Sequence, residues 1–139
     1  MAQEELHDTG VSQKAIVVNE EGKMLAVRRS DSAPRNALRW DLPGGILDFG
    51  EDAKEGIIRE IKEEAGLEVK DVKVFDVISK FNELKEFWVT IGYTAQALSK
   101  DVKLSYEHVE FKWVTLDEFL NLDASDKLKQ LVKIYKETK

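Results

Sequence analysis

Cysteine is absent from this 139-residue chain, and proline occurs only twice. Without cysteine the chain can form neither disulfides nor thiolate metal sites, which excludes zinc fingers and agrees with a reducing compartment. The N-terminus is polar and acidic, so it lacks the basic start and apolar stretch of a secretory signal. No apolar run approaches the length of a membrane span. We therefore expect a cytoplasmic protein that does not enter a membrane.

Basic side chains are outnumbered as well. The chain has 21 lysines and arginines against 27 acidic residues, a formal net charge of −6. Because nucleic-acid binding draws most of its affinity from basic side chains on phosphates, this balance argues against a nucleic-acid polymer as a partner. A small anionic ligand remains compatible if a metal ion screens its charge. A hydrophobic content of 42% is enough for the core of one domain.

Hydrophobic periodicity predicts strands that alternate with helices. Residues 1–10 show no such period and are expected to form a flexible tail, while residues 11–139 are expected to form a single α/β domain with a mixed sheet. The expected strands, in two hairpins and one single strand, are 14–18 with 23–28, 72–81 with 86–97, and 109–114. An exposed loop is expected at 30–39. The expected helices are 52–65, ended by Gly66, a short turn at 116–120, and a C-terminal helix with Leu128, Leu131, Val132 and Tyr135 on one face.

The predicted helix at 52–65 carries a cluster of carboxylates. At about 100° per residue, one side of this helix is apolar and holds Ile57, Ile58, Ile61 and Ala65. The neighbouring side gathers Glu60, Glu63 and Glu64. Their mutual repulsion costs roughly 0.2–0.5 kcal/mol per close pair, and a divalent cation would turn it into attraction. Carboxylates suit Mg²⁺, which prefers oxygen ligands, and Arg59 can fix the direction of a glutamate.

A bare cluster of glutamates usually marks a solvated helix face, but the spacing around this one is specific. From Gly45 the chain runs five residues to Glu51, then seven residues to Arg59-Glu60-Ile61-Lys62-Glu63-Glu64-Ala65-Gly66-Leu67. This segment resembles the Nudix box, Gly-x5-Glu-x7-Arg-Glu-U-x-Glu-Glu-x-Gly-U with U apolar, at every specified position. A chance match is well below about one in a million per starting point. Residues 40–45 and 110–118 are also similar to the family's lead-in and late strand.

The resemblance implies a fold and an activity. The fold is the Nudix-type α/β/α sandwich with a mixed sheet. The activity is hydrolysis of a phosphoanhydride bond in a small-molecule nucleotide, with water attacking phosphorus and with Mg²⁺ as the cofactor, for which Mn²⁺ can substitute. The implied metal ligands are Glu60, Glu63, Glu64 and the carbonyl of Gly44.

The resemblance also implies roles for three other residues of this sequence. Arg59 would orient the glutamates, and Glu51 would brace the loop against the helix. Glu60 is the implied base that activates water. Glu107, in the loop before the late strand, is the alternative base, although an ordinary surface role is equally compatible with its position.

Several weaker features leave alternatives open. Arg29 ends the second predicted strand, where its guanidinium can meet substrate phosphates, and a surface role is equally compatible. A surface role is favoured for Arg28, Arg35 and Arg39. Neither His7 nor His108 has the spacing of a metal site. Aromatic side chains in strands can stack on a base but more often belong to the core, and the candidates are Trp40, Trp88, Trp113, Phe81, Phe87 and Tyr93.

The residues downstream of the box narrow the range of substrate classes. Subfamilies that act on ADP-ribose and NADH have prolines there, whereas Pro34 and Pro43 of this chain lie upstream. The chain is similar instead to the MutT-like nucleoside triphosphate pyrophosphohydrolases. Two alternatives are a Nudix enzyme for another diphosphate, such as a nucleotide sugar, and a catalytically silent Nudix domain that senses a ligand. The oligomeric state is open, a homodimer included.

Overall fold

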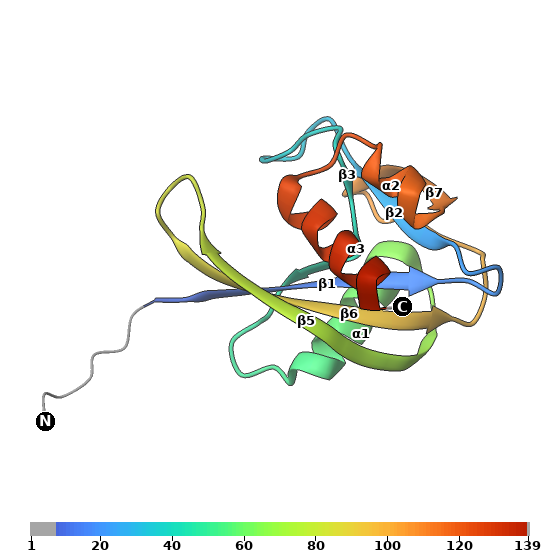
Figure 1. The fold of residues 1–139 in the computed structure, drawn as a ribbon, viewed down its shortest axis with the longest axis horizontal. Helices are drawn as coiled ribbons and strands as arrows, with labels where there is room; N and C mark the ends of the chain where they lie inside the picture. The colour runs from blue at the N-terminus through green and yellow to red at the C-terminus, as the bar shows by residue number, and fades with distance from the viewer. Residues whose placement is uncertain (1–7, 139) are drawn as a thin grey trace, which may run out of the picture.

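The computed structural model describes residues 8–138 and places a mixed sheet between two layers of helix (Figure 1). The strands are β1 (Gly10–Val18), β2 (Met24–Arg29), β3 (Trp40–Asp41), β4 (Gly44–Ile46), β5 (Val69–Phe81), β6 (Phe87–Ala97) and β7 (His108–Val114). The helices are α1 (Ala53–Ala65), α2 (Leu116–Leu120) and α3 (Asp126–Thr138). Helix α1 covers one face of the sheet, and α2 and α3 cover the other. The expected α/β/α sandwich is confirmed. No helix within residues 8–138 is long and apolar enough to cross a membrane.

The sheet divides into two branches beside β1. Strand β1 runs parallel to β6 along its whole length, and the other strand pairs are antiparallel. It pairs with β2 only at Val18 and Met24, because β4 occupies the same edge of β1 from Ser12 to Lys14. Strand β2 continues instead into a branch with β3 and β7. We call the opening between the two branches the fork.

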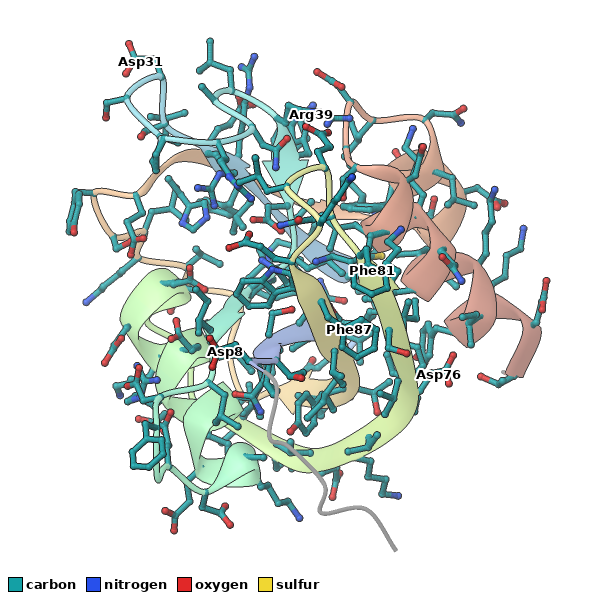
Figure 2. The ribbon with its side chains drawn as sticks, turned by 90° about the vertical axis from the view of Figure 1, so that its left-hand side faces the viewer. Asp8, Asp31, Arg39, Asp76, Phe81 and Phe87 are labelled. Carbon is teal, nitrogen blue, oxygen red and sulfur yellow. The ribbon has the colours of Figure 1, made fainter. Side chains whose placement is uncertain are left out.

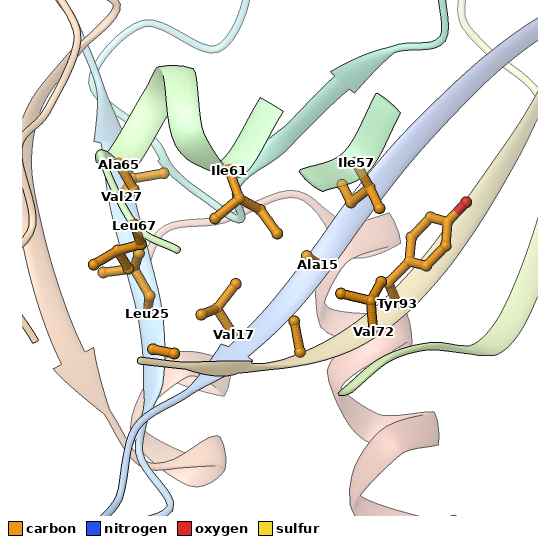
Figure 3. Packing of buried hydrophobic residues seen from close by; sticks show 12 residues of the cluster. Ala15, Val17, Leu25, Val27, Ile57, Ile61, Ala65, Leu67, Val72 and Tyr93 are labelled. Carbon is orange, nitrogen blue, oxygen red and sulfur yellow. The ribbon is translucent and has the colours of Figure 1, made fainter. Parts of the chain in front are cut away.

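Each face of the sheet carries its own core. Successive residues of a strand point to opposite faces, so Ala15 and Val17 pack toward α1 while Ile16 packs toward α2 and α3. Ile57 and Ile61 of α1 are fully buried in the first core (Figure 3). The second core holds the predicted apolar face of α3, namely Leu128, Leu131 and Val132, with Tyr135 partly buried against it. Burial of each such side chain contributes roughly 1.5–3 kcal/mol, so the two cores fix both helix layers on the sheet.

Some predicted boundaries were wrong. Strand β1 begins at Gly10 rather than at residue 14, so the last residue of the predicted tail belongs to the sheet; residues 1–7 of that tail lie outside the described residues. Strand β5 begins at Val69 rather than at residue 72. Strands β3 and β4 were not predicted because two or three residues are too few to show alternation. Ile58 was assigned to the buried side of its helix but is 37% exposed, because it lies about 100° from Ile57.

Candidate active site

Both ends of α1 are defined by local hydrogen bonds. Asp52 precedes the helix in an extended conformation, and its side chain accepts the N–H of Glu55 at 3.0 Å. Gly66 ends the helix with a left-handed φ of 68°, and its N–H donates to the carbonyl of Lys62, as predicted. An N-cap of this kind contributes about 1 kcal/mol. The two ends fix where α1 starts and stops, and therefore which of its side chains face β4.

Glu64 lies on the side of α1 that meets β4. Its side chain is only 6% exposed, and its Oε1 accepts the backbone N–H of Gly44 at 2.7 Å. Burial raises the pKa of Glu64 to about 8, against the lowering effects of Lys14 and the Gly44 N–H. The charges of Glu60 and Asp41 raise this pKa further. At neutral pH the Glu64 carboxyl of the metal-free protein is therefore mostly protonated.

Two glycines allow β4 to pass between β1 and α1. Gly44 has a φ of +147°, and a Cβ there would lie 1.9 Å from the carbonyl oxygen of Gln13. A Cβ on Gly45 would lie 2.9 Å from Oε1 of Glu60. A side chain at either position would collide, with the strand on one side or with a glutamate on the other. The paired glycines therefore permit the close approach of β4 to β1 and α1.

Arg59 joins the acidic side chains of this region. Its Nε and Nη2 donate to the two carboxylate oxygens of Glu51 at 2.7 and 3.0 Å, and its Nη1 donates to Glu63 at 3.0 Å. An ion pair to Glu60 is 3.2 Å long. Glu51 also accepts the N–H of Asp48 at 3.3 Å, so it ties the loop to the helix. These contacts lower the pKa of Glu51 and raise that of Arg59. The arrangement has the geometry that the orienting and bracing roles require.

The two candidate bases lie at the same cleft. Burial raises the pKa of Glu60; the Arg59 cation opposes this, and the charges of Glu63 and Glu107 add to it. Glu107 is exposed and lies in the loop before β7, where its backbone carbonyl accepts the N–H of Ser30 at 3.0 Å. Both Glu60 and Glu107 line the cleft.

The cleft has a volume of about 600 Å³ and lies at the fork. One wall is acidic and holds Glu60, Glu63, Glu64 and Glu107. The lining also contains basic side chains, namely Lys14, Arg29, Arg35, Arg39, Lys80 and Lys127. Figure 2 views the molecule from the side where Arg39 and the β5–β6 hairpin border the cleft. A protein with a net negative charge thus gathers cations in the same cleft as its carboxylates.

A buried ion network forms the floor of the cleft, and sequence reasoning missed it. Asp41 is 6% exposed and accepts hydrogen bonds from Lys14 Nζ at 2.9 Å, the Leu42 N–H at 2.7 Å and Arg29 Nη1 at 3.4 Å. Burial alone would raise the pKa of Asp41, but these partners hold it below its usual value. One carboxylate here pairs with two cations, so the network carries a net positive charge that can attract an anionic ligand. The available signal was a lysine at the start of an apolar strand and an aspartate between Trp40 and Leu42.

Several of the remaining residues named in the sequence analysis lie either in the cleft or in the core. Arg29 lies in the cleft, with its Nε donating to the Arg35 carbonyl at 2.9 Å. Tyr93 belongs to the core, whereas Trp88 and Phe81 line the cleft. His108 is buried, which lowers its pKa, and its Nδ1 has no hydrogen-bond partner within residues 8–138. His7 lies outside the described residues.

The acidic wall fits a hard divalent cation by its chemistry. No three acidic or histidine side chains of the described chain are already arranged as a metal site. The physical reason is that the Gly44 N–H engages Glu64 while Arg59 engages Glu60 and Glu63. All the donors are nevertheless carboxylate or carbonyl oxygens, the ligands that Mg²⁺ prefers. Their crowding helps to raise the pKa values of Glu60 and Glu64, and a bound cation would relieve that repulsion.

An α/β/α sandwich with a glutamate-rich helix over a charged cleft is the arrangement of a Nudix-type hydrolase. The model of the NUDIX domain matches residues 8–134, and the chain belongs to this family. It is therefore a Nudix hydrolase, an enzyme that cleaves pyrophosphate bonds.

Individual relatives agree with this assignment. The chain is 31% identical over 113 residues to a MutT-like protein of Streptomyces ambofaciens, covering 81% of this chain and 67% of that protein. It is 33% identical over 102 residues to a putative 8-oxo-dGTP diphosphatase 2 of Mycobacterium tuberculosis, covering 73% and 72%. The crystal structure of a MutT protein from Methanosarcina mazei has a TM-score of 0.80 and 32% identity, covering 94% of this chain and 96% of that one. The chain spans only 38% and 41% of two longer relatives from Arabidopsis thaliana.

Proposed function

We propose that this Nudix hydrolase cleaves a phosphoanhydride bond of a nucleoside triphosphate and releases pyrophosphate. The observation that carries the proposal is the cleft, in which a wall of carboxylates faces basic side chains beyond those that Asp41 neutralises. A triphosphate meets both walls, with metal-bound phosphates at the carboxylates and further phosphate oxygens at the cations. The M. tuberculosis relative, by its description, acts on a nucleoside triphosphate, which supports the same class of substrate.

Mg²⁺ is the proposed cofactor, with Mn²⁺ as a substitute. Glu60, Glu63, Glu64 and the Gly44 carbonyl would hold it, in competition with the Arg59 and Gly44 N–H contacts. When bound, the cation would neutralise charge on the phosphate oxygens, which supplies much of the catalysis in phosphoryl transfer.

The side chains themselves perform the other steps. Glu60 accepts the proton of the attacking water, because its carboxylate lines the cleft beside Glu63 and Glu64. Arg59 limits the directions available to the Glu60 carboxylate through their ion pair. Lys14 and Arg29 contact substrate phosphates while Asp41 holds both in place. Glu107 is the alternative base, since it lines the same cleft.

A substrate panel with product identification tests the proposal. Nucleoside triphosphates, nucleotide sugars and ADP-ribose are compared with Mg²⁺, with Mn²⁺ and with excess EDTA. We expect pyrophosphate release from at least one triphosphate, and complete loss of turnover in EDTA. Preference for a nucleotide sugar or ADP-ribose by orders of magnitude in kcat/KM would contradict the substrate assignment, and full activity in EDTA would contradict the metal. No turnover of any compound would support the ligand-sensing alternative.

Three other expectations stay predictions. They are a cytoplasmic location, a single domain over residues 11–139, and the oligomeric state, for which a homodimer is one of the alternatives. Light scattering of the purified chain measures the last of these directly.

A further inference from the structure

The cleft continues along β1 beyond the carboxylates. Gly44 of β4 pairs with Lys14, whereas Trp88 of β6 pairs with Gly10, four residues further along β1. At about 3.3 Å per residue, these two points lie about 13 Å apart. An extended nucleotide whose phosphates meet the carboxylates therefore brings its base toward the end of the cleft that Trp88 lines.

The lining of this end combines aromatic side chains with the polar and basic side chains Lys80 and Asn82 and with Lys127 from α3. Trp88 comes from β6, Phe81 from the end of β5, and Lys127 and Leu128 from the first turn of α3. Figure 2 shows Phe81 on the hairpin that borders this end. Flat aromatic surfaces suit a nucleobase, because every base has a face that can stack. Lys127 is then one of the groups here that can distinguish one base from another.

Lys127 lies among interactions that disfavour its charge. It is half-buried, and within residues 8–138 it forms no hydrogen bond or ion pair. Its position in the first turn of α3 places a cation at the positive end of the helix dipole. Burial lowers the pKa of Lys127, and the nearby charges of Lys14 and Lys80 lower it further. Asp41 opposes this shift, but it already accepts hydrogen bonds from Lys14 and Arg29.

We propose that Lys127 selects the base of the substrate by donating a hydrogen bond to a keto oxygen, with the base packed against Trp88 and Phe81. The inference rests on the proposed function, whose substrate it narrows. An ammonium group is only a donor. Guanine and hypoxanthine present a 6-oxo acceptor, and uracil and thymine a 4-oxo acceptor, whereas adenine and cytosine present an amino donor at the same edge. Two donors repel, so keto bases are favoured.

Inosine triphosphate and ATP provide the sharpest comparison, because their bases differ only in the 6-oxo or 6-amino group and in the proton that hypoxanthine carries on the adjacent N1. We expect kcat/KM of the parent enzyme to be about 5- to 150-fold higher for inosine triphosphate, the range of one good base contact. Lys127→Met should bring the ratio close to one, mainly through loss of inosine triphosphate turnover. Lys127→Glu should favour ATP, since a carboxylate accepts from the amino group. Lys133→Met removes the same charge from an exposed position of α3 and should leave the parent ratio unchanged.

Dissociation constants of both nucleotides, measured in EDTA, separate the two proposals. Tighter binding of inosine triphosphate without turnover would contradict the proposed function and support base selection. Equal values for the two nucleotides in the parent enzyme, or a preference that survives in a folded Lys127→Met, would overturn the inference. An equal loss for both nucleotides in Lys127→Met would also overturn it, because Lys127 would then contact a phosphate. Thermal melts establish that each variant is folded.

Discussion

Replacing Glu64 with glutamine tests whether the buried carboxyl is an unfavourable charge that the metal compensates. The glutamine Oε1 can still accept the N–H of Gly44, which Glu64 accepts at 2.7 Å, so the substitution removes the charge and keeps the hydrogen bond. In metal-free protein the pKa of Glu64 is raised from 4.5 to about 8. Between these values the folded state binds the proton and the unfolded state does not. The stability of the parent therefore falls as pH rises through this window.

The magnitude is set by the difference between the two pKa values. Each pKa unit corresponds to about 1.4 kcal/mol, so complete ionisation of Glu64 in the folded protein costs about 5 kcal/mol. At pH 7, about 2.5 pH units above the ordinary pKa, the cost has reached about 3 kcal/mol. Repulsion between solvated glutamates alone would give only tenths of a kcal/mol. A domain of this kind is stable by roughly 5–15 kcal/mol in total, so the effect is large enough to measure.

Urea unfolding of both proteins at pH 5 and pH 8 in EDTA is the assay. We expect Glu64→Gln to be more stable than the parent at pH 8, with a much smaller difference at pH 5. Glu83→Gln, an exposed position, should follow the parent at both pH values. The same change of stability with pH in the parent and in Glu64→Gln would refute the reasoning. A large loss of stability in Glu64→Gln at pH 5 would reveal a partner that requires the carboxyl.

Adding Mg²⁺ to the same proteins should narrow the difference in stability between them. A ligand that binds only the folded state stabilises it by about 2.7 kcal/mol at one hundred times Kd, and a weakened site loses part of this. The metal-induced rise in Tm should therefore be smaller for Glu64→Gln than for the parent. Equal rises would remove Glu64 from the metal site.

Three further substitutions separate catalysis from folding. Glu60→Gln should lower kcat by about 10²–10⁴-fold and Glu107→Gln by less, and the opposite ranking in two folded variants would move the base to Glu107. Gly45→Ala should weaken Mg²⁺ binding and lower kcat with little change in Tm, because the three atoms nearest its Cβ all belong to the Glu60 carboxylate; unchanged metal affinity by calorimetry would contradict this. Gly44→Ala should destabilise by roughly 3 kcal/mol or more in urea unfolding, because its Cβ overlaps the backbone of β1 at a positive φ; a midpoint like that of the parent would show that the strand can move.

The parts of the site that sequence predicted are those fixed by local spacing. The separation of Gly45, Glu51 and Arg59 along one loop and helix determines which of them can touch, and the structure brings Arg59 onto Glu51 with two hydrogen bonds. The C-terminal end of α1 followed from its capping glycine, Gly66. The face of α3 followed from its helical period.

The parts that sequence missed depend on which strands become neighbours. Lys14 lies on β1, which pairs with β4, whereas Asp41 lies on β3, which pairs with β2 in the other branch. The two side chains meet because the fold brings these strands together. Neither residue carries a spacing that indicates this contact. Likewise, the helical period groups Glu64 with Glu60 but does not show that β4 covers Glu64 and shifts its pKa. Tertiary pairing decides burial, and burial decides the charge state.

The cleft at the fork is built from a frame of two paired strands and from segments that can vary without disturbing them. The frame is β1 with β6, which hold each other in nine consecutive parallel pairs. The 30–39 loop, the tip of the β5–β6 hairpin and the first turn of α3 border the cleft, and none of them contributes to those pairs. A change in any one of these parts alters what the cleft accepts while the strands beneath keep their register. Such modularity means that one framework can serve different ligands through substitutions in three short segments, and grafting those segments between relatives is the corresponding route to a new specificity.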